Sequence, residues 1–226
     1  LNTTNIASLD GTRLGALSTT VLGALDTTQT EALTSTQVGL LKTTQLNALS
    51  ATTFADLSTT DIGALTTTQV TGLTATQAER LTSTQVANLT TTQIGALTAT
   101  NLATFSTTDL GTLDTTQVGA LTSAQVSRLS NTQIANLSST QFAAIASTAV
   151  AGLTSLQLAT VPTANLTALS TTSLNALTTQ ALGGVTSTQV ANRTTTQLSG
   201  LTATRFAALS TTALGGLTTT EVDILT

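Results

Sequence analysis

The chain repeats every eight residues from end to end, and no insertion or deletion breaks this period. Leu1, Leu9 and every eighth residue after them open 28 complete octads, and Leu225 and Thr226 open a twenty-ninth. We number the positions of each octad 1 to 8. Such a short unit cannot bury an apolar face by itself, so neighbouring units must share one core, as they do in a solenoid.

Two positions of the octad carry large apolar residues throughout. Position 6 is apolar in every octad except at Thr30. Position 1 is Leu with five exceptions, which are Phe105, Ile145, Val161, Val185 and Arg193. These two columns are predicted to form the core.

Position 2 indicates where a helix begins. It holds Ser, Thr, Asp or Asn except at Lys42, Ala146 and Pro162, and these four residue types are the preferred helix N-caps. Position 5 follows three residues later and is Gln in 14 octads, which is the spacing of the capping box. Positions 1 and 6 then stand as N′ and N4, the pair that forms a hydrophobic staple. The pattern predicts a helix from about position 3 to position 8 of each octad.

The predicted fold class is therefore all-α, a solenoid of about 28 very short helices that forms one continuous unit over residues 1–226. Helices this short are unstable alone, so they must stack on one another. A β-solenoid is the alternative, because Thr and Val also favour strands, and disorder is a third. Position 4 is Thr in 24 octads, and Leu156 and Ala164 among its exceptions suggest partial burial there.

Composition excludes several function classes. The chain has no His, Cys, Met, Trp or Tyr, and 7% of its residues are charged, so the usual metal ligands, thiol nucleophiles and acid–base residues are missing together. We expect no enzyme, no catalytic residue, no cofactor, no metal and no small-molecule substrate. The net charge of −4 and the scattered Lys and Arg argue against nucleic acid. Polar residues interrupt every apolar run well short of the roughly 18 that a spanning helix needs, so we expect a soluble chain without membrane insertion.

Few residues depart from the pattern in a way that suggests a site. Asn-x-Ser/Thr triplets could accept a glycan; they begin at Asn2, Asn88, Asn136, Asn165 and Asn192. We interpret them as products of the register, which creates a triplet whenever Asn occupies position 8, as at Asn88, Asn136 and Asn192. Asp56 and Asp61 lie five residues apart, a spacing that suggests a paired-carboxylate site. No acid partner or metal ligand recurs beside them, so we interpret them as solvated surface charges.

Arg193 and Pro162 depart from the register more sharply. Arg193 stands in the leucine column, and Pro162 stands at an N-cap position. We interpret both as tolerated drift in a redundant array, with a bend or a lateral contact as the alternatives. Thr at positions 2 and 4 also forms a Thr-x-Thr ladder.

The octads "LTTTQVTG" (Leu65 to Gly72) and "LTTTQIGA" (Leu89 to Ala96) resemble the Thr/Gln-rich octapeptide arrays of very long secreted or surface proteins of Gram-negative bacteria. The resemblance implies a spacer, stalk or fibre at the cell surface or outside the cell. A solenoid binding module is the alternative, either adhesin-type or ice-binding through the threonine ladder. Both ends of the chain are in register and lack a polar capping unit, so we expect a segment of a longer array that self-associates end to end or laterally.

Overall fold

The structure is a computed structural model that describes the backbone of residues 1–225 and the side chains of residues 1–223. The described chain contains 28 short helices and no strand. The predicted all-α class is confirmed, and the β-solenoid alternative is wrong. Thr226 and the side chain of Leu225, which open the twenty-ninth octad, lie outside the described residues.

Each octad contributes one helix of four to seven residues, and each helix begins at position 3. In chain order the helices are α1 Thr3–Ala7, α2 Gly11–Ala16, α3 Thr19–Gly23, α4 Thr27–Glu31, α5 Ser35–Leu40, α6 Thr43–Leu46, α7 Ala51–Ala55, α8 Thr59–Gly63, α9 Thr67–Thr71, α10 Ala75–Arg80, α11 Ser83–Ala87, α12 Thr91–Ala96, α13 Ala99–Ala103, α14 Thr107–Gly111, α15 Thr115–Gly119, α16 Ser123–Arg128, α17 Asn131–Asn136, α18 Ser139–Ala144, α19 Ser147–Val150, α20 Ser155–Thr160, α21 Thr163–Ala168, α22 Thr171–Ala176, α23 Thr179–Leu182, α24 Ser187–Ala191, α25 Thr195–Ser199, α26 Ala203–Phe206, α27 Thr211–Leu214 and α28 Thr219–Leu225.

The predicted N-caps are confirmed. In α12, for example, the Thr90 hydroxyl accepts a hydrogen bond of 3.1 Å from the Gln93 backbone N–H, and the Gln93 side chain accepts one of 2.9 Å from the Thr90 N–H. The side-chain cap is missing only in α6, α19 and α21 among the described helices, where position 2 is Lys42, Ala146 or Pro162. The residue type at position 2 therefore decides whether a cap forms.

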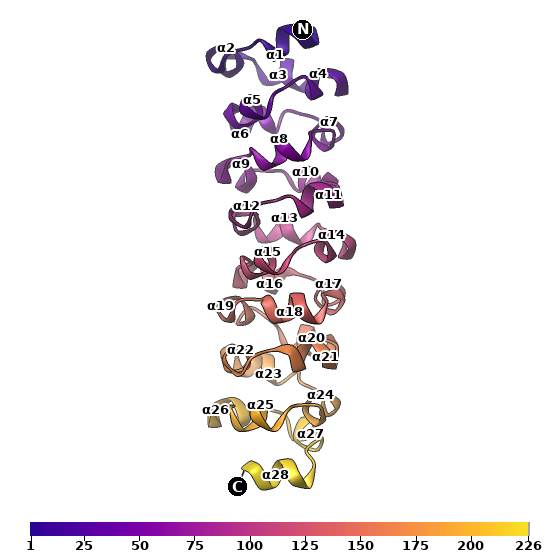
Figure 1. Cartoon of the computed structure of the whole chain (residues 1–226), viewed down its shortest axis with the longest axis vertical. Helices are drawn as coiled ribbons and strands as arrows, with labels where there is room; N and C mark the ends of the chain where they lie inside the picture. The colour runs from indigo at the N-terminus through magenta and orange to yellow at the C-terminus, as the bar shows by residue number, and fades with distance from the viewer. Residues whose placement is uncertain (226) are drawn as a thin grey trace. The chain divides into compact units, whose positions relative to one another are not determined.

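The chain divides into two compact units, Leu1–Thr112 and Leu113–Thr226. Within each unit a helix packs against the helix three octads further along the chain, as α9 does against α12 in unit 1 and α15 against α18 in unit 2 (Figure 1). Each unit is thus an α-solenoid. That residues 1–226 form one continuous solenoid stays a prediction.

One coil of the solenoid takes about three and a half octads. Side-chain hydrogen bonds between successive coils join residues 25 to 31 apart, and a separation of 28 is the most regular. An octad therefore does not lie directly over another octad. It lies over the junction between two octads of the preceding coil.

The two predicted core columns are buried. Position 1 is buried in every octad from Leu25 to Leu177, and position 6 from Ile6 to Leu198. Thr30, the polar exception at position 6, is fully buried, and its hydroxyl donates to the Asp26 carbonyl at 3.0 Å. A threonine is tolerated there because its polar atom is satisfied within its own helix.

Candidate functional site

Position 5 holds a column of buried polar side chains that we call the glutamine ladder. Gln69 is 2% exposed, and its amide makes hydrogen bonds in two directions. Its Oε1 accepts from the Thr66 N–H at 2.7 Å, which completes the capping box of α9. Its Nε2 donates to the carbonyls of Val38 and Leu41, both at 2.8 Å, in the preceding coil. One side chain thus starts its own helix and holds it on the coil before.

The same geometry recurs at other glutamines of the ladder. In unit 1, Gln93 donates to the carbonyls of Ile62 and Leu65, and in unit 2, Gln157 donates to those of Val126 and Leu129. The acceptors lie 31 and 28 residues earlier, at position 6 of one octad and position 1 of the next. Each of these glutamines therefore bonds to both sides of a junction between two helices.

Octads with another residue at position 5 keep only part of these contacts. Which part they keep depends on the length of the side chain and on whether it can donate a hydrogen bond. Asn101 is one methylene shorter than Gln and keeps only the contact with the preceding coil, donating to the Leu73 carbonyl at 2.8 Å. Asp61 has no N–H to donate and keeps only the capping box with Ser58. Of these three side chains, only the glutamine amide both accepts from the N–H of its N-cap residue and donates to the preceding coil.

Asp109 contacts the preceding coil in the opposite sense, as an acceptor. It closes the capping box with Ser106 and also accepts a hydrogen bond of 2.6 Å from the Ser83 hydroxyl. Burial alone would raise the pKa of Asp109, but the hydrogen bonds from Ser106 and Ser83 outweigh it and lower this pKa below its usual value. The carboxylate is therefore kept ionised by its partners.

Position 4 faces solvent in all 28 described octads. The partial burial predicted from Leu156 and Ala164 is wrong, because position 4 lies on the outer side of the first helical turn while position 5 lies beneath it. Leu156 is 70% exposed. The hydroxyls at position 2 of the Thr-x-Thr ladder are engaged as N-caps. In most octads, therefore, only the hydroxyl at position 4 has no structural role.

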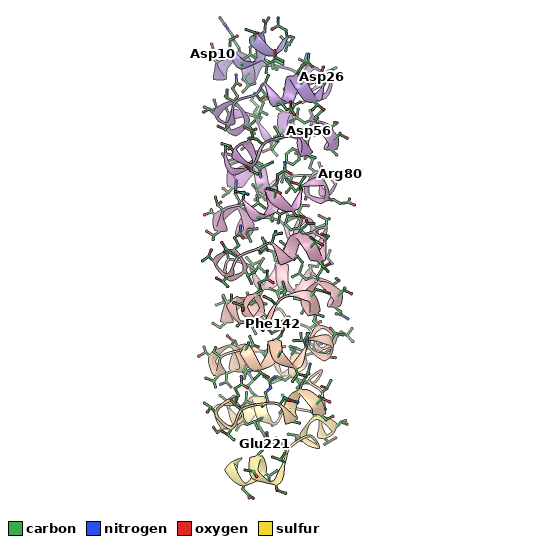
Figure 2. The ribbon with its side chains drawn as sticks, turned by 45° about the vertical axis from the view of Figure 1, so that its right-hand side comes forward. Asp10, Asp26, Asp56, Arg80, Phe142 and Glu221 are labelled. Atoms are coloured by element: carbon green, nitrogen blue, oxygen red, sulfur yellow. The ribbon has the colours of Figure 1, made fainter. Side chains whose placement is uncertain are left out.

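The two aspartates considered as a pair have separate roles. Asp56 accepts a hydrogen bond of 2.8 Å from the Thr27 hydroxyl in the preceding coil. Asp61 is 7% exposed, so its interpretation as a solvated surface charge is wrong. Its burial follows from position 5, a buried column that the apolar pattern of the octad does not reveal. Charges that do lie at the surface include Asp10, Asp26 and Arg80 (Figure 2).

The candidate glycosylation sites differ in accessibility. Asn165 occupies position 5, is 4% exposed, and donates to the Leu137 carbonyl at 2.7 Å. It cannot accept a glycan in the folded chain. Asn88, Asn136 and Asn192 are exposed, and the amide of each donates to the carbonyl four residues earlier at 2.8 Å. Asn2 is exposed and serves as the N-cap of α1.

Pro162 fits its position because the octad around it dispenses with the cap. Proline has no N–H, so the side chain at position 5 has nothing to accept there, and the shorter Asn165 suffices for the contact with the preceding coil. Val161 before it has the extended backbone that a following proline requires.

Arg193 lies half-buried in the leucine column of unit 2. Its guanidinium donates to the backbone carbonyls of Gln189, Leu166 and Thr163. Burial lowers the pKa of Arg193 to about 10. Beside it is an apolar cavity of about 30 Å³, also lined by Leu174, Leu177, Val185 and Leu198. The arginine bonds to helix-end carbonyls and leaves part of the leucine volume empty.

Fold and ladder together define an α-solenoid repeat protein with buried polar contacts between its coils. A family model described as the ALTTAQ repeat matches residues 6–43, which supports a repeat array. No curated protein matches the chain.

Two other features are absent from the described residues. No helix in that part of the chain is both long and apolar enough to cross a membrane. No three or more Asp or Glu side chains there are grouped so that they could hold a metal ion.

Proposed function

We propose that this chain is a non-enzymatic structural protein, a fibre, stalk or matrix spacer outside the cell, whose length is set by its number of octads. The observation that carries the proposal is the glutamine ladder. Ladder glutamines such as Gln69 donate their amide N–H groups to two carbonyls of the preceding coil, so every octad added in register extends the same stack.

The outer surface supports this proposal. Position 4 presents a threonine hydroxyl in 24 octads, and only 7% of all residues are charged. Such a uniform neutral surface suits a spacer better than an enzyme, which needs converging groups of different chemistry. The low charge, the abundant hydroxyls and the resemblance to secreted octapeptide arrays support an extracellular location.

Small-angle X-ray scattering of a lengthened chain tests the proposal. Insertion of seven octads, 56 residues or about two coils, should increase the maximum dimension while the cross-sectional radius of gyration stays constant. A globule would instead grow in all directions, with a radius of gyration that scales roughly as the 0.38 power of length. Growth of the cross-section with the insertion would contradict a spacer.

A lateral contact between copies is the form of self-association that the exposed surface favours. Leu156 is 70% exposed in a column that is otherwise nearly all Thr. Sedimentation velocity over a range of concentrations should detect association that Leu156→Thr weakens, whereas Ala164→Thr, a change in the same column one octad later, should not. Equal association of both variants would remove Leu156 from the contact.

Leu156 also favours the second candidate, a solenoid binding module, over a purely passive spacer. If the chain stays monomeric at every concentration, the exposed leucine is better explained as an anchor for another protein. Ice binding has less support, because the hydroxyls at position 2 are engaged as N-caps.

A further inference from the structure

We propose that the array extends one coil at a time under load, and that opening in unit 2 begins at the octads of α22 and α23, Leu169–Gly184, which we call the yielding segment. The inference rests on the proposed spacer function and adds a mechanical behaviour to it.

The yielding segment lacks the ladder contacts. Its two residues at position 5 are Ser173, whose hydroxyl accepts from the Ser170 hydroxyl of its own octad at 3.1 Å, and Ala181, which has no polar side-chain atom. The octads on either side keep a donor: Asn165 donates once and Gln189 twice to the preceding coil. Two adjacent octads are thus held on the coil before them without a glutamine.

The core next to the yielding segment is also incomplete. Val185 and Arg193 are half-buried at position 1, and the cavity of about 30 Å³ lies between them, Leu174 and Leu177. A void forfeits the dispersion contacts of the side chains that line it. The partners of the Arg193 guanidinium are backbone carbonyls and the Thr167 hydroxyl, all of them neutral, so its desolvation is only partly offset.

Unit 1 provides an internal comparison. Thr53 and Asp61 also follow one another at position 5, and their hydroxyl and carboxylate bond within their own octads. The leucines around them, Leu57 and Leu65, are 2% and 4% exposed. In the yielding segment, by contrast, position 5 has no donor to the preceding coil, and the next two residues of the leucine column, Val185 and Arg193, are only half-buried.

Opening of one coil leaves remote coils in place. The side-chain hydrogen bonds between coils span 25 to 31 residues, so a released coil breaks bonds only to its neighbours, as in other quasi-one-dimensional folds. Fully extended chain covers at most about 3.3–3.6 Å per residue. A released coil of about 28 residues therefore adds on the order of 90–100 Å of contour length, less the thickness of the folded coil.

Single-molecule extension of the full chain, combined with hydrogen–deuterium exchange, tests the proposal. We expect successive force steps of about one coil each, and amide exchange in residues 169–184 that is at least tenfold faster than in α15–α18. Two repairs should slow that exchange at least tenfold and raise the force of the earliest step. Ser173→Gln places an amide within reach of the Phe142 and Ile145 carbonyls, 31 and 28 residues earlier, and Val185→Leu fills the cavity.

Thr172→Gln is the matched control, because it adds the same side chain at the exposed position 4 of the same helix. It should change neither exchange nor force. Release of the whole chain in one step would overturn the coil-by-coil proposal, and exchange in 169–184 as slow as in α15–α18 would remove the yielding segment. Both outcomes leave the scattering test of the spacer unaffected, so the two proposals can fail separately.

Discussion

The amide nitrogen of each ladder glutamine is the atom on which coil stacking depends most directly. Gln69→Glu keeps the size of the side chain and its acceptor for the Thr66 N–H, but it replaces the donor with a carboxylate oxygen that faces the carbonyls of Val38 and Leu41. We expect a loss of about 2–4 kcal/mol in the free energy of unfolding at pH 7, as for a buried charge with unsatisfied partners.

This loss should depend on pH. The facing carbonyls disfavour the ionised form, so the folded-state pKa of the introduced Glu lies above its unfolded value of about 4.3. The destabilisation is then smallest below pH 4, where the carboxylic acid can donate, and grows as the pH rises through the folded pKa. Thermal unfolding at pH 4 and pH 7 measures it. Thr68→Glu, at the exposed position 4 of the same helix, is the control and should change little at either pH.

The core column and the first helical turn should respond differently to the same acid. Leu89 is 4% exposed, whereas Thr91 is exposed at the start of α12, where a negative charge is favoured. Leu89→Asp should cost about 3–5 kcal/mol, and Thr91→Asp within about 0.5 kcal/mol of zero. Urea unfolding measures both. Comparable stability of the two variants would contradict the register.

The sequence predicts the caps and the apolar columns but not the burial of position 5. Capping is a local interaction over three residues, so Ser, Thr, Asp and Gln at fixed spacing suffice to predict it. The second contact of each glutamine lies 28 to 31 residues away and leaves no local pattern. One signal was present: a capping box is served equally well by Glu, yet position 5 holds 14 Gln and one Glu. That preference indicates a need for a donor.

At the scale of the helix, glycine at position 8 brings the backbone close to the preceding coil where position 5 is Ala. Helices α19, α23 and α27 have Ala at position 5, and each has four residues. The glycine that follows each of them, such as Gly184 after α23, lies so close to the preceding coil that an added Cβ would stand 2.0–2.2 Å from a serine carbonyl oxygen. The backbones approach directly where no glutamine stands between them.

Alanine substitutions should separate this role of glycine from its helix propensity. Gly184→Ala would force backbone apart and should cost about 1–3 kcal/mol, as overpacking does. Gly63, in α8, has nothing within 4 Å of an added Cβ, so Gly63→Ala should stabilise by about 0.5–1 kcal/mol through helix propensity. Thermal melts decide the matter: if Gly184→Ala melts as high as the parent protein, the close approach is not a constraint.

At the scale of the whole molecule, the hydrogen bonds of the ladder depend on where a residue stands within its octad and not on which octad it belongs to. Deletion of eight residues, 82–89, should therefore preserve cooperative unfolding, because every later glutamine meets equivalent carbonyls one octad away. Deletion of four residues, 86–89, places the later glutamines opposite the wrong positions and should abolish the sharp transition. Circular dichroism during heating compares the two, and similar melts would show that register across the coils is unimportant.

The half-octad offset between coils has a consequence for a broken backbone. Leu40, at the end of α5, is 55% exposed and offers its side chain to a protease that cuts after leucine. The amide of Gln69 donates to the Val38 carbonyl before such a cut and to the Leu41 carbonyl after it. The two fragments of a cleaved chain would stay joined without a covalent link. Produced separately, residues 1–40 and 41–226 should reassemble when mixed. A chain cut once after Leu40 should therefore keep its folded structure.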